Sequence, residues 1–286
     1  MTAPLSEQAP AKINLTLRVA GRRADGYHTL ESLVAFADLA DTLTLTPGAE
    51  TALGLAGPFA EATGPVNDNL IFKAVDALAA RVDALKSGRF QLEKRIPVAG
   101  GVGGGSADAA GSLRLLARLN KLVPGDARLV AAAKSVGADV PVCLDPRPRI
   151  MRGTGEELSA PVALPRLPAL LVNPGVPLAT RDVFAVFNGP SSAQDELGAV
   201  PAQREALLAL LARHGNDLTE AAISCAPAIG EVLDALGSLA GVRLARMSGS
   251  GPTCFALFDR AAEADAAAAK LKSAHPTWWV YSGNIA

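Results

Sequence analysis

Apolar and polar residues alternate strictly from Lys12 to Val19. A period of two is typical of a half-buried β-strand, in which successive side chains point to opposite faces. The pattern therefore places Lys12 and Asn14 on the same face of one strand. A polar turn follows, and residues 33–45 then predict a second extended stretch. The chain is thus expected to begin with a β-rich layer.

Helical spacing first appears in residues 69–85, where apolar side chains recur every three or four positions with alanines between them. Alanine is the best helix former, so this segment predicts a helix. Residues 89–99 alternate like a strand and run into a glycine-rich stretch, after which a helix is expected to begin near Ser106. A further helix is predicted from Ala127 to Val136 and ended by the following glycine, which leaves Asp139 in a loop.

The second half of the chain also mixes the two periods. Strands are predicted at 169–172, 254–258 and 278–282, and helices at 205–214, 229–239 and 261–271. The proline-rich segment 159–168 has neither period and is the best candidate for a crossing between domains. We therefore expect two domains, residues 1–160 and 161–286, with an α+β fold because both halves mix strands and helices.

Charge and composition narrow the classes of protein. The 286 residues carry 27 Lys plus Arg against 28 Asp plus Glu, a net charge of -1, which gives no overall positive field for nucleic acid or an acidic membrane. No signal peptide and no run of 18 apolar residues is present, so a soluble cytoplasmic protein is expected. Cys143, Cys225 and Cys254 are too far apart for a zinc site or a disulfide framework and are expected to be reduced core thiols.

The strongest chemical signal is a glycine loop, since five of the six residues from Gly100 to Gly105 are glycine. The loop joins a predicted strand to a predicted helix. Free N–H groups and the helix dipole attract an anion at such a place, and phosphate is the natural guest. Ser106 can add a hydroxyl or cap the helix. The order of residues in this loop fits neither the P-loop motif nor the dinucleotide-binding motif. The alternative to a phosphate-binding loop is a flexible glycine hinge that binds no ligand.

Four short motifs resemble those of the GHMP kinases (galactokinase, homoserine kinase, mevalonate kinase and phosphomevalonate kinase), in the same order and spacing. They are P-A-K-I-N-L at Pro10 to Leu15, P-V-A-G-G-V-G-G-G-S at Pro97 to Ser106, G-A-D-V-P at Gly137 to Pro141 and S-G-S-G-P at Ser248 to Pro252. The segment R-A-D-G-Y-H-T-L at Arg23 to Leu30 further resembles the branch that phosphorylates 4-diphosphocytidyl-2-C-methyl-D-erythritol. The loop departs from many relatives by having Ala99 in place of a first glycine.

The resemblance implies a two-domain GHMP kinase fold, with an N-terminal domain like ribosomal protein S5 domain 2 and a ferredoxin-like C-terminal domain. It also implies transfer of the γ-phosphoryl group of ATP to the 2-hydroxyl of the cytidyl-diphosphate sugar alcohol, giving the 2-phosphate and ADP in non-mevalonate isoprenoid biosynthesis. Mg²⁺ is expected with the ATP, and neither nucleic acid nor a membrane is expected as a partner. The alternatives are a GHMP kinase for another alcohol, such as homoserine or mevalonate, an RNA-binding module, or an inactive kinase that senses nucleotide. The near-neutral charge and the intact motifs weigh against the last two.

Carried onto this sequence, the resemblance makes Asp139 the catalytic aspartate, which accepts or orients the hydroxyl proton. Lys12 becomes the catalytic lysine, whose ammonium could hold Asp139 ionised, lower the pKa of the acceptor hydroxyl or contact the phosphoryl group. The sequence leaves these three roles open. The segment expected to bind ATP comprises Pro97, Val98, Ala99, Gly100, Gly101, Val102, Gly103, Gly104, Gly105, Ser106 and Ala107.

Four further residues are implied to bind the second substrate. Tyr27 corresponds to a tyrosine that stacks on the cytosine, and His28 to a histidine that hydrogen-bonds the base. Phe184 is expected on the other side of the base, with a place in the core as the alternative. Asn14 is expected to contact the substrate from the strand face that it shares with Lys12. No residue is assigned as a metal ligand.

Overall fold

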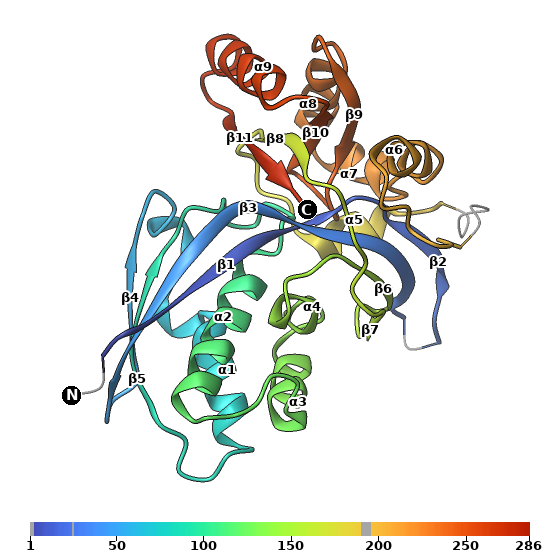
Figure 1. Ribbon diagram of the computed structural model, residues 1–286. Coiled ribbons are helices and arrows are strands. Elements are labelled where there is room, and N and C mark those ends of the chain that lie inside the picture. The colour runs from blue at the N-terminus through green and yellow to red at the C-terminus, as the bar shows by residue number, and fades with distance from the viewer. Residues whose placement is uncertain (1–2, 25, 190–195) are drawn as a thin grey trace. The chain divides into compact units, whose positions relative to one another are not determined.

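The computed structural model describes residues 3–24, 26–189 and 196–286 (Figure 1). Within them the chain forms two compact units that are interleaved in sequence. Unit 1 comprises the residues up to Lys12 together with 39–98 and 103–146, and unit 2 comprises 13–38, 99–102 and 147–286. The expected division into residues 1–160 and 161–286 stays a prediction about domain boundaries.

Unit 1 combines a sheet with four α-helices. The second half of β3 (His28–Gly48) pairs antiparallel with β5 (Ser87–Glu93), which pairs parallel with β4 (Ala52–Ala56), while β1 (Leu5–Asn14) also pairs with β3. The helices are α1 (Leu70–Ala79), α2 (Gly104–Leu119), α3 (Ala127–Val136) and α4 (Val140–Leu144), with 3₁₀ turns η1 (Glu61–Thr63) and η2 (Val66–Asp68) before α1. Figure 1 shows α1 to α4 gathered beside these strands.

Capping explains why the helices of unit 1 begin where they do. The Asn69 side chain accepts a hydrogen bond from the N–H of Ile71 at the start of α1, and Asp126 caps α3 in the same way. The expected bounds of α3 are confirmed. The prediction for α1 was too long, because apolar residues beyond Leu78 are not buried and the chain turns at Ala84, whose φ is +52°. The helix expected near Ser106 begins two residues earlier.

The prediction of one half-buried strand from Lys12 to Val19 was wrong, because this segment belongs to two strands and most of its polar side chains are buried. β1 ends at Asn14, and β2 (Arg18–Arg22) begins after a short break. Lys12, Asn14 and Thr16 are all buried. Each of the three makes a hydrogen bond inside the protein, and a paired polar side chain can be buried without a large penalty.

Unit 2 contains a sheet in which β8 (Leu167–Asn173) lies between β10 (Cys254–Phe258) and β11 (Trp279–Ile285), with β9 (Val242–Met247) beyond β10; all neighbours are antiparallel. The first half of β3 pairs with β2 and with β6 (Arg149–Gly153), and β6 pairs with β7 (Glu157–Leu158). The helices are α5 (Thr180–Val186), α6 (Arg204–Arg213), α7 (Thr219–Cys225), α8 (Ala228–Gly237) and α9 (Ala261–Ala274).

The core of unit 2 explains its continuous apolar strands. All seven residues of β8 are buried, and residues of β8, β10, α8 and α9 share one apolar cluster. A strand covered on both faces reads as an apolar run without alternation, as the sequence of β8 does. The expected strands and helices of this half are present, whereas the helices α5 and α7 and the strands β6, β7 and β9 were not predicted. Both units mix helices and strands, which confirms the α+β class.

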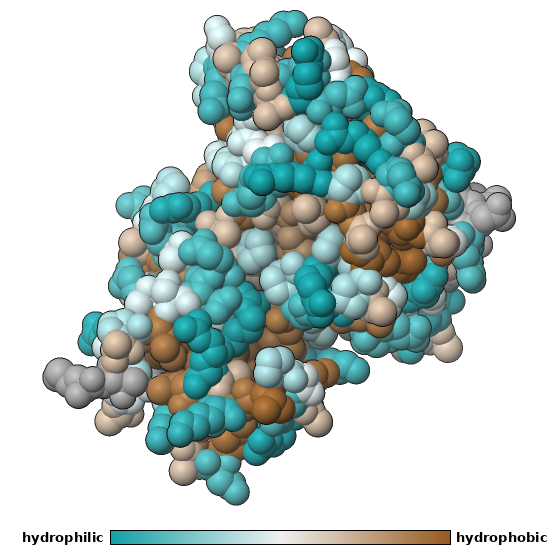
Figure 2. Space-filling view, in the orientation of Figure 1, coloured by the Kyte–Doolittle hydropathy of each residue, from teal (hydrophilic) through white to brown (hydrophobic). Residues whose placement is uncertain are grey.

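The visible surface of each unit carries mainly hydrophilic residues (Figure 2). Figure 2 shows hydrophilic residues spread over the visible face of each unit, with small apolar areas between them. No helix in the described ranges is long and apolar enough to cross a membrane.

All three cysteines are free thiols, and Cys143 and Cys254 are buried as expected. The prediction for Cys225 was wrong, because this thiol ends α7 on the exposed surface.

Candidate active site

Lys12 and Asp139 form an ion pair in unit 1. Lys12 lies near the end of β1, and Asp139 is the residue before α4, where it occupies the cap position. The Lys12 Nζ donates to Oδ2 of Asp139 at 2.8 Å. The lysine side chain is only 5% exposed whereas that of the aspartate is 34% exposed. A buried ammonium needs a counter-charge, and this carboxylate supplies it while remaining open to a substrate.

The start of α2 lies against the same lysine. Gly103, the residue before α2, has a φ of +64°, in the left-handed region that glycine adopts without strain. A Cβ at this position would lie 3.2 Å from Cβ of Lys12, so glycine leaves room for the lysine side chain. No side chain among the described residues caps α2, and its first N–H groups have no partner within the helix. Unit 1 therefore places a cation, a carboxylate and an anion-attracting helix start side by side.

The middle of the glycine loop, residues 99–102, belongs to unit 2 and rests on the loop that follows β9. The N–H of Thr253 donates to the carbonyl of Gly100 at 3.1 Å, and the hydroxyl of Ser248 donates to that of Gly101 at 3.3 Å. A Cβ at Gly101 would lie 2.2 Å from the carbonyl oxygen of Gly251. The S-G-S-G-P motif thus supports the glycine loop through main-chain contacts that demand glycine.

Asn14 is held in unit 2 by hydrogen bonds that settle its orientation. Its Nδ2 donates to the hydroxyl of Ser32 at 2.7 Å, and that hydroxyl in turn donates to the carbonyl of Thr16 at 2.5 Å. The remaining atom, Oδ1 of Asn14, is buried and has no hydrogen-bond partner among the described residues. Buried polar atoms are nearly always paired, so this unpaired acceptor is an unusual feature of the site.

The aromatic residues predicted to bind a base also lie in unit 2. The rings of His28 and Phe184 stack with centroids 5.0 Å apart and planes inclined by 22°. Phe187, which the sequence did not single out, meets His28 edge-on at 5.9 Å. Tyr27 is 67% exposed. The residue before Gly26 in this motif, Asp25, lies outside the described residues.

The charge state of His28 follows from its surroundings. Partial burial lowers the pKa of His28 below its ordinary value of 6.5, and the positive charge of Arg22 lowers it further. The imidazole is therefore neutral at pH 7, with one nitrogen that donates a hydrogen bond and one that accepts. A neutral ring of this kind can read both a donor and an acceptor on the edge of a base.

Metal binding by side chains alone has little support in the described ranges. They contain no group of three or more His, Cys, Asp or Glu side chains that could hold a metal ion. Mg²⁺ in phosphoryl-transfer enzymes is bound largely by substrate phosphates and water, with one or two carboxylates, so a nucleotide-borne ion would not need such a group.

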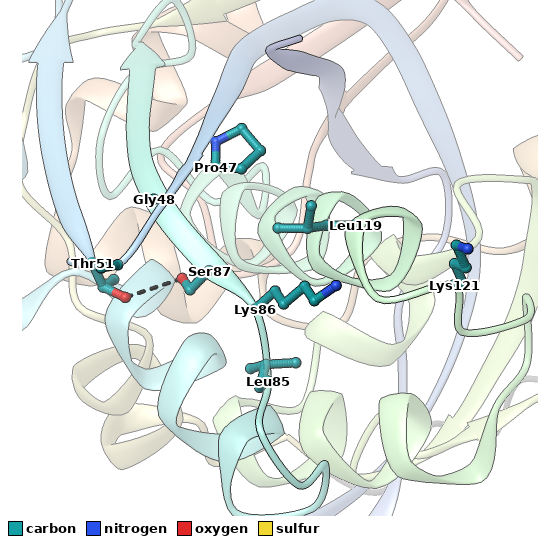
Figure 3. A pocket seen from close by; sticks show the side chains of 9 residues that line it. Pro47, Gly48, Thr51, Leu85, Lys86, Ser87, Leu119 and Lys121 are labelled. Carbon is teal, nitrogen blue, oxygen red and sulfur yellow. Dashed lines mark hydrogen bonds between the residues drawn. The ribbon is translucent and has the colours of Figure 1, made fainter. Parts of the chain in front are cut away.

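A groove of about 710 Å³ lies in unit 1 at the other end of α2. Figure 3 shows Leu119, at the end of that helix, with Lys86 next to it in this view, and a hydrogen bond between Thr51 and Ser87. The helix is 16 residues long, so its two ends are about 24 Å apart at 1.5 Å per residue. None of the predicted site residues is among the described residues that line this groove.

Two protein-family models match the chain. The GHMP kinases N terminal domain matches residues 69–145, which include the glycine loop and Asp139. The description GHMP kinases C terminal matches residues 197–277, which include the S-G-S-G-P motif.

Individual relatives match the chain over nearly its whole length. The chain is 54% identical over 296 residues to the 4-diphosphocytidyl-2-C-methyl-D-erythritol kinase of Rhodopseudomonas palustris (strain BisB5), covering 100% of both proteins. It is 55% identical to the protein of that name from Methylobacterium radiotolerans, with 96% of this chain and 97% of the relative covered.

Solved structures agree with the sequence matches. A crystal structure of 4-(cytidine 5'-diphospho)-2C-methyl-D-erythritol kinase superimposes with a TM-score of 0.78 at 36% identity, covering 98% of this chain and 99% of that one. A homoserine kinase from Cytophaga hutchinsonii superimposes with a TM-score of 0.73 at 19% identity, covering 99% and 95%. At this identity the second match speaks for the fold alone.

Proposed function

The chain belongs to the GHMP kinases and, within them, to the 4-diphosphocytidyl-2-C-methyl-D-erythritol kinases, and from that premise we propose how its residues carry out the reaction. The reaction is transfer of the γ-phosphoryl group of ATP to the 2-hydroxyl of 4-diphosphocytidyl-2-C-methyl-D-erythritol, which yields the 2-phosphate and ADP. The single observation that supports our assignment of roles is the Lys12–Asp139 ion pair beside the start of α2.

Asp139 is the proton acceptor in this proposal. Its carboxylate is partly exposed and can take the proton of the acceptor hydroxyl as the oxygen attacks the γ-phosphorus. Lys12 pairs with that carboxylate and offers its positive charge to the transferring group, whose negative charge is spread over three oxygens. The protein contributes mainly position and electrostatic stabilisation, because little covalent chemistry falls to its side chains.

The glycine loop, from Pro97 to Ala107, is the proposed site for the ATP phosphates. The main-chain N–H groups at the start of α2 are aimed out of the helix and need an acceptor. Phosphate oxygens satisfy them and also gain from the positive end of the helix dipole. Mg²⁺ bound to the phosphates would supply further positive charge there. We also propose that the enzyme works in the cytoplasm, where ATP is available.

The proposed site for the cytidyl substrate is built from unit 2 residues. The face of an aromatic ring can stack on cytosine, and Tyr27 and Phe184 are the two rings assigned to it. His28, neutral at pH 7, would hydrogen-bond the edge of the base. Oδ1 of Asn14, which has no hydrogen-bond partner among the described residues, would accept a hydrogen bond from a substrate hydroxyl. Homoserine and mevalonate have no base, so an acceptor of that kind would leave the aromatic residues without a role.

Release of ADP by the purified protein tests this proposal directly. With ATP and Mg²⁺, we expect ADP release in the presence of 4-diphosphocytidyl-2-C-methyl-D-erythritol and none above background with homoserine or mevalonate. The Asp139→Asn variant, prepared in parallel, controls for a contaminating kinase. Turnover with homoserine or mevalonate and none with the cytidyl compound would overturn the substrate assignment.

A further inference from the structure

Three charged side chains form a fully buried cluster in unit 1 that the mechanism above does not use. Lys94 lies just after β5 and donates hydrogen bonds to Asp41 on β3 and, at 2.8 Å, to Asp108 on α2. The side chains of Lys94, Asp41 and Asp108 are 3%, 0% and 3% exposed. The cluster thus joins a strand, the end of the neighbouring strand and a helix.

This buried cluster contacts the residues at both ends of the glycine loop. Oδ1 of Asp41 accepts hydrogen bonds from the N–H groups of Arg95, at 2.5 Å, and Ile96, at 2.9 Å, the two residues that precede the glycine loop. Asp108 follows the loop directly, one residue beyond Ala107. A Cβ at Gly104 would lie 3.0 Å from Nζ of Lys94, so the ammonium also lies against the first residue of α2. Both ends of the glycine loop are therefore tied to the same three side chains.

Stability alone gives no reason to bury these charges. One ammonium faces two carboxylates, and the second carboxylate has to be desolvated without a cation of its own. Burial raises the pKa of Asp108 to about 7, with the charge of Lys94 opposing this shift and that of Asp41 adding to it. A buried ionic cluster is often no more stable than apolar residues of the same volume. Asp108 is therefore better explained by what it holds in place than by its contribution to the free energy of folding.

We propose that Asp108 and Asp41 are positioning residues, which act through Lys94 to hold the two ends of the glycine loop at the spacing that the phosphates of ATP require. Neither carboxylate touches ATP in this proposal. Lys94 ties α2 to the end of β5, and Asp41 orients the main chain where the loop begins. The inference rests on the proposed role of the loop in ATP binding, but the tie between the loop ends can be tested without turnover.

Asp108→Leu is the most informative variant, because it leaves Lys94 and Asp41 as a balanced ion pair and is expected to fold. We expect the midpoint of thermal unfolding to stay close to that of the wild type. Backbone hydrogen exchange in the peptide that contains residues 97–105 should become faster. The KM for ATP should rise by about tenfold, the equivalent of losing one charge-assisted hydrogen bond, while the KM for the acceptor stays within about twofold.

Asp108→Asn provides a graded comparison, since an amide oxygen accepts from Lys94 more weakly than a carboxylate. Its effect on exchange and on the KM for ATP should fall between those of the wild type and of Asp108→Leu. Glu7→Gln is the matched control. Glu7 pairs with Arg114 and Arg118 on the same helix, away from the loop, so this variant should leave both measurements unchanged.

The proposal would be overturned if Asp108→Leu changed neither the hydrogen exchange of residues 97–105 nor the KM for ATP. If that variant does not accumulate as folded protein, unchanged exchange in Asp108→Asn has the same meaning. Failure of the proposed function would look different, because the wild type would then release no ADP while the exchange result still stood by itself.

Discussion

Nζ of Lys12 lies 2.8 Å from Oδ2 of Asp139, although 127 positions separate the two residues in the chain. Only the fold of unit 1 brings them together, since β1 places the lysine and the turn before α4 places the aspartate. The pair is unequal in exposure, and this inequality gives each residue its role. The covered lysine supplies charge, and the accessible aspartate meets the substrate.

Replacing the aspartate should separate chemistry from binding. In Asp139→Asn the side chain keeps its size but no longer accepts a proton, so turnover should fall by about 10²-fold or more. The KM for ATP should change little, because the N–H groups at the start of α2 are unaffected. Steady-state ADP release with both substrates varied measures the two quantities. Turnover close to that of the wild type would show that Asp139 is not an essential proton acceptor.

Phe184→Ala should weaken binding of the cytidyl substrate. Stacking of a base on an aromatic face is worth about 1–3 kcal/mol, so the KM for the acceptor should rise by roughly 5- to 150-fold. The KM for ATP should be unaffected. Phe187→Ala is the comparison variant, because Phe187 meets His28 by its edge and should have a smaller effect. An acceptor KM equal to that of the wild type in Phe184→Ala would leave the ring with a packing role alone.

Gly101→Ala should disrupt the glycine loop. Gly101 has a φ of +71°, and a Cβ there would lie 2.2 Å from the carbonyl oxygen of Gly251. Left-handed geometry costs an L-residue roughly 1–2 kcal/mol even without a clash, so both thermal stability and turnover should fall. Gly105→Ala is the matched control, because its Cβ would meet only Leu70 at an ordinary 3.5 Å. Equal behaviour of the two variants would contradict the structural distinction between them.

Asp108 should make the stability of the protein depend on pH. Burial raises the pKa of this carboxyl to about 7 in the folded protein, against about 3.9 in an unfolded chain. Between these values the folded state holds a proton that the unfolded state has lost, so stability declines as the pH rises through this window. Asp108→Asn cannot ionise and should lack this contribution. Urea unfolding of both proteins between about pH 4 and 8 tests it, since the difference between their midpoints should move in favour of the variant up to about pH 7. Parallel curves would show that Asp108 does not titrate in this range.

Local patterns predicted much of the secondary structure. The bounds of α3 follow from its apolar spacing, its Asp126 cap and the glycine after it. The alternation of β9 is weak, and five of its six residues are half-buried or exposed, so it carried no clear period. The short helices α5 and α7, of seven residues each, offer too few turns for a helical pattern to stand out.

The candidate site was predictable where motifs carry it, and much less so elsewhere. Lys12, Asp139 and the glycine loop stand in recognisable motifs, and the structure places the two side chains and the start of α2 together. Lys94 and Asp41 were not singled out, because a charged residue in or next to a strand normally faces solvent. Their burial depends on partners distant in the chain, and no local pattern encodes such a pairing. Phe187 was also missed, because its contact with His28 joins residues that are far apart in the chain.

The interleaving of the two units has a consequence for synthesis of the chain. Unit 1 is complete once Pro146 has been made, but residues 13–38 belong to unit 2 and leave the ribosome long before most of it. Residues 30–34 of β3 therefore lack their β6 partner until residues 149–153 emerge. A strand with an unpaired edge is prone to misassociate in a nascent chain. This edge of β3 therefore stays unpaired while residues 35–148 are made, and no single cut in the chain separates the two units.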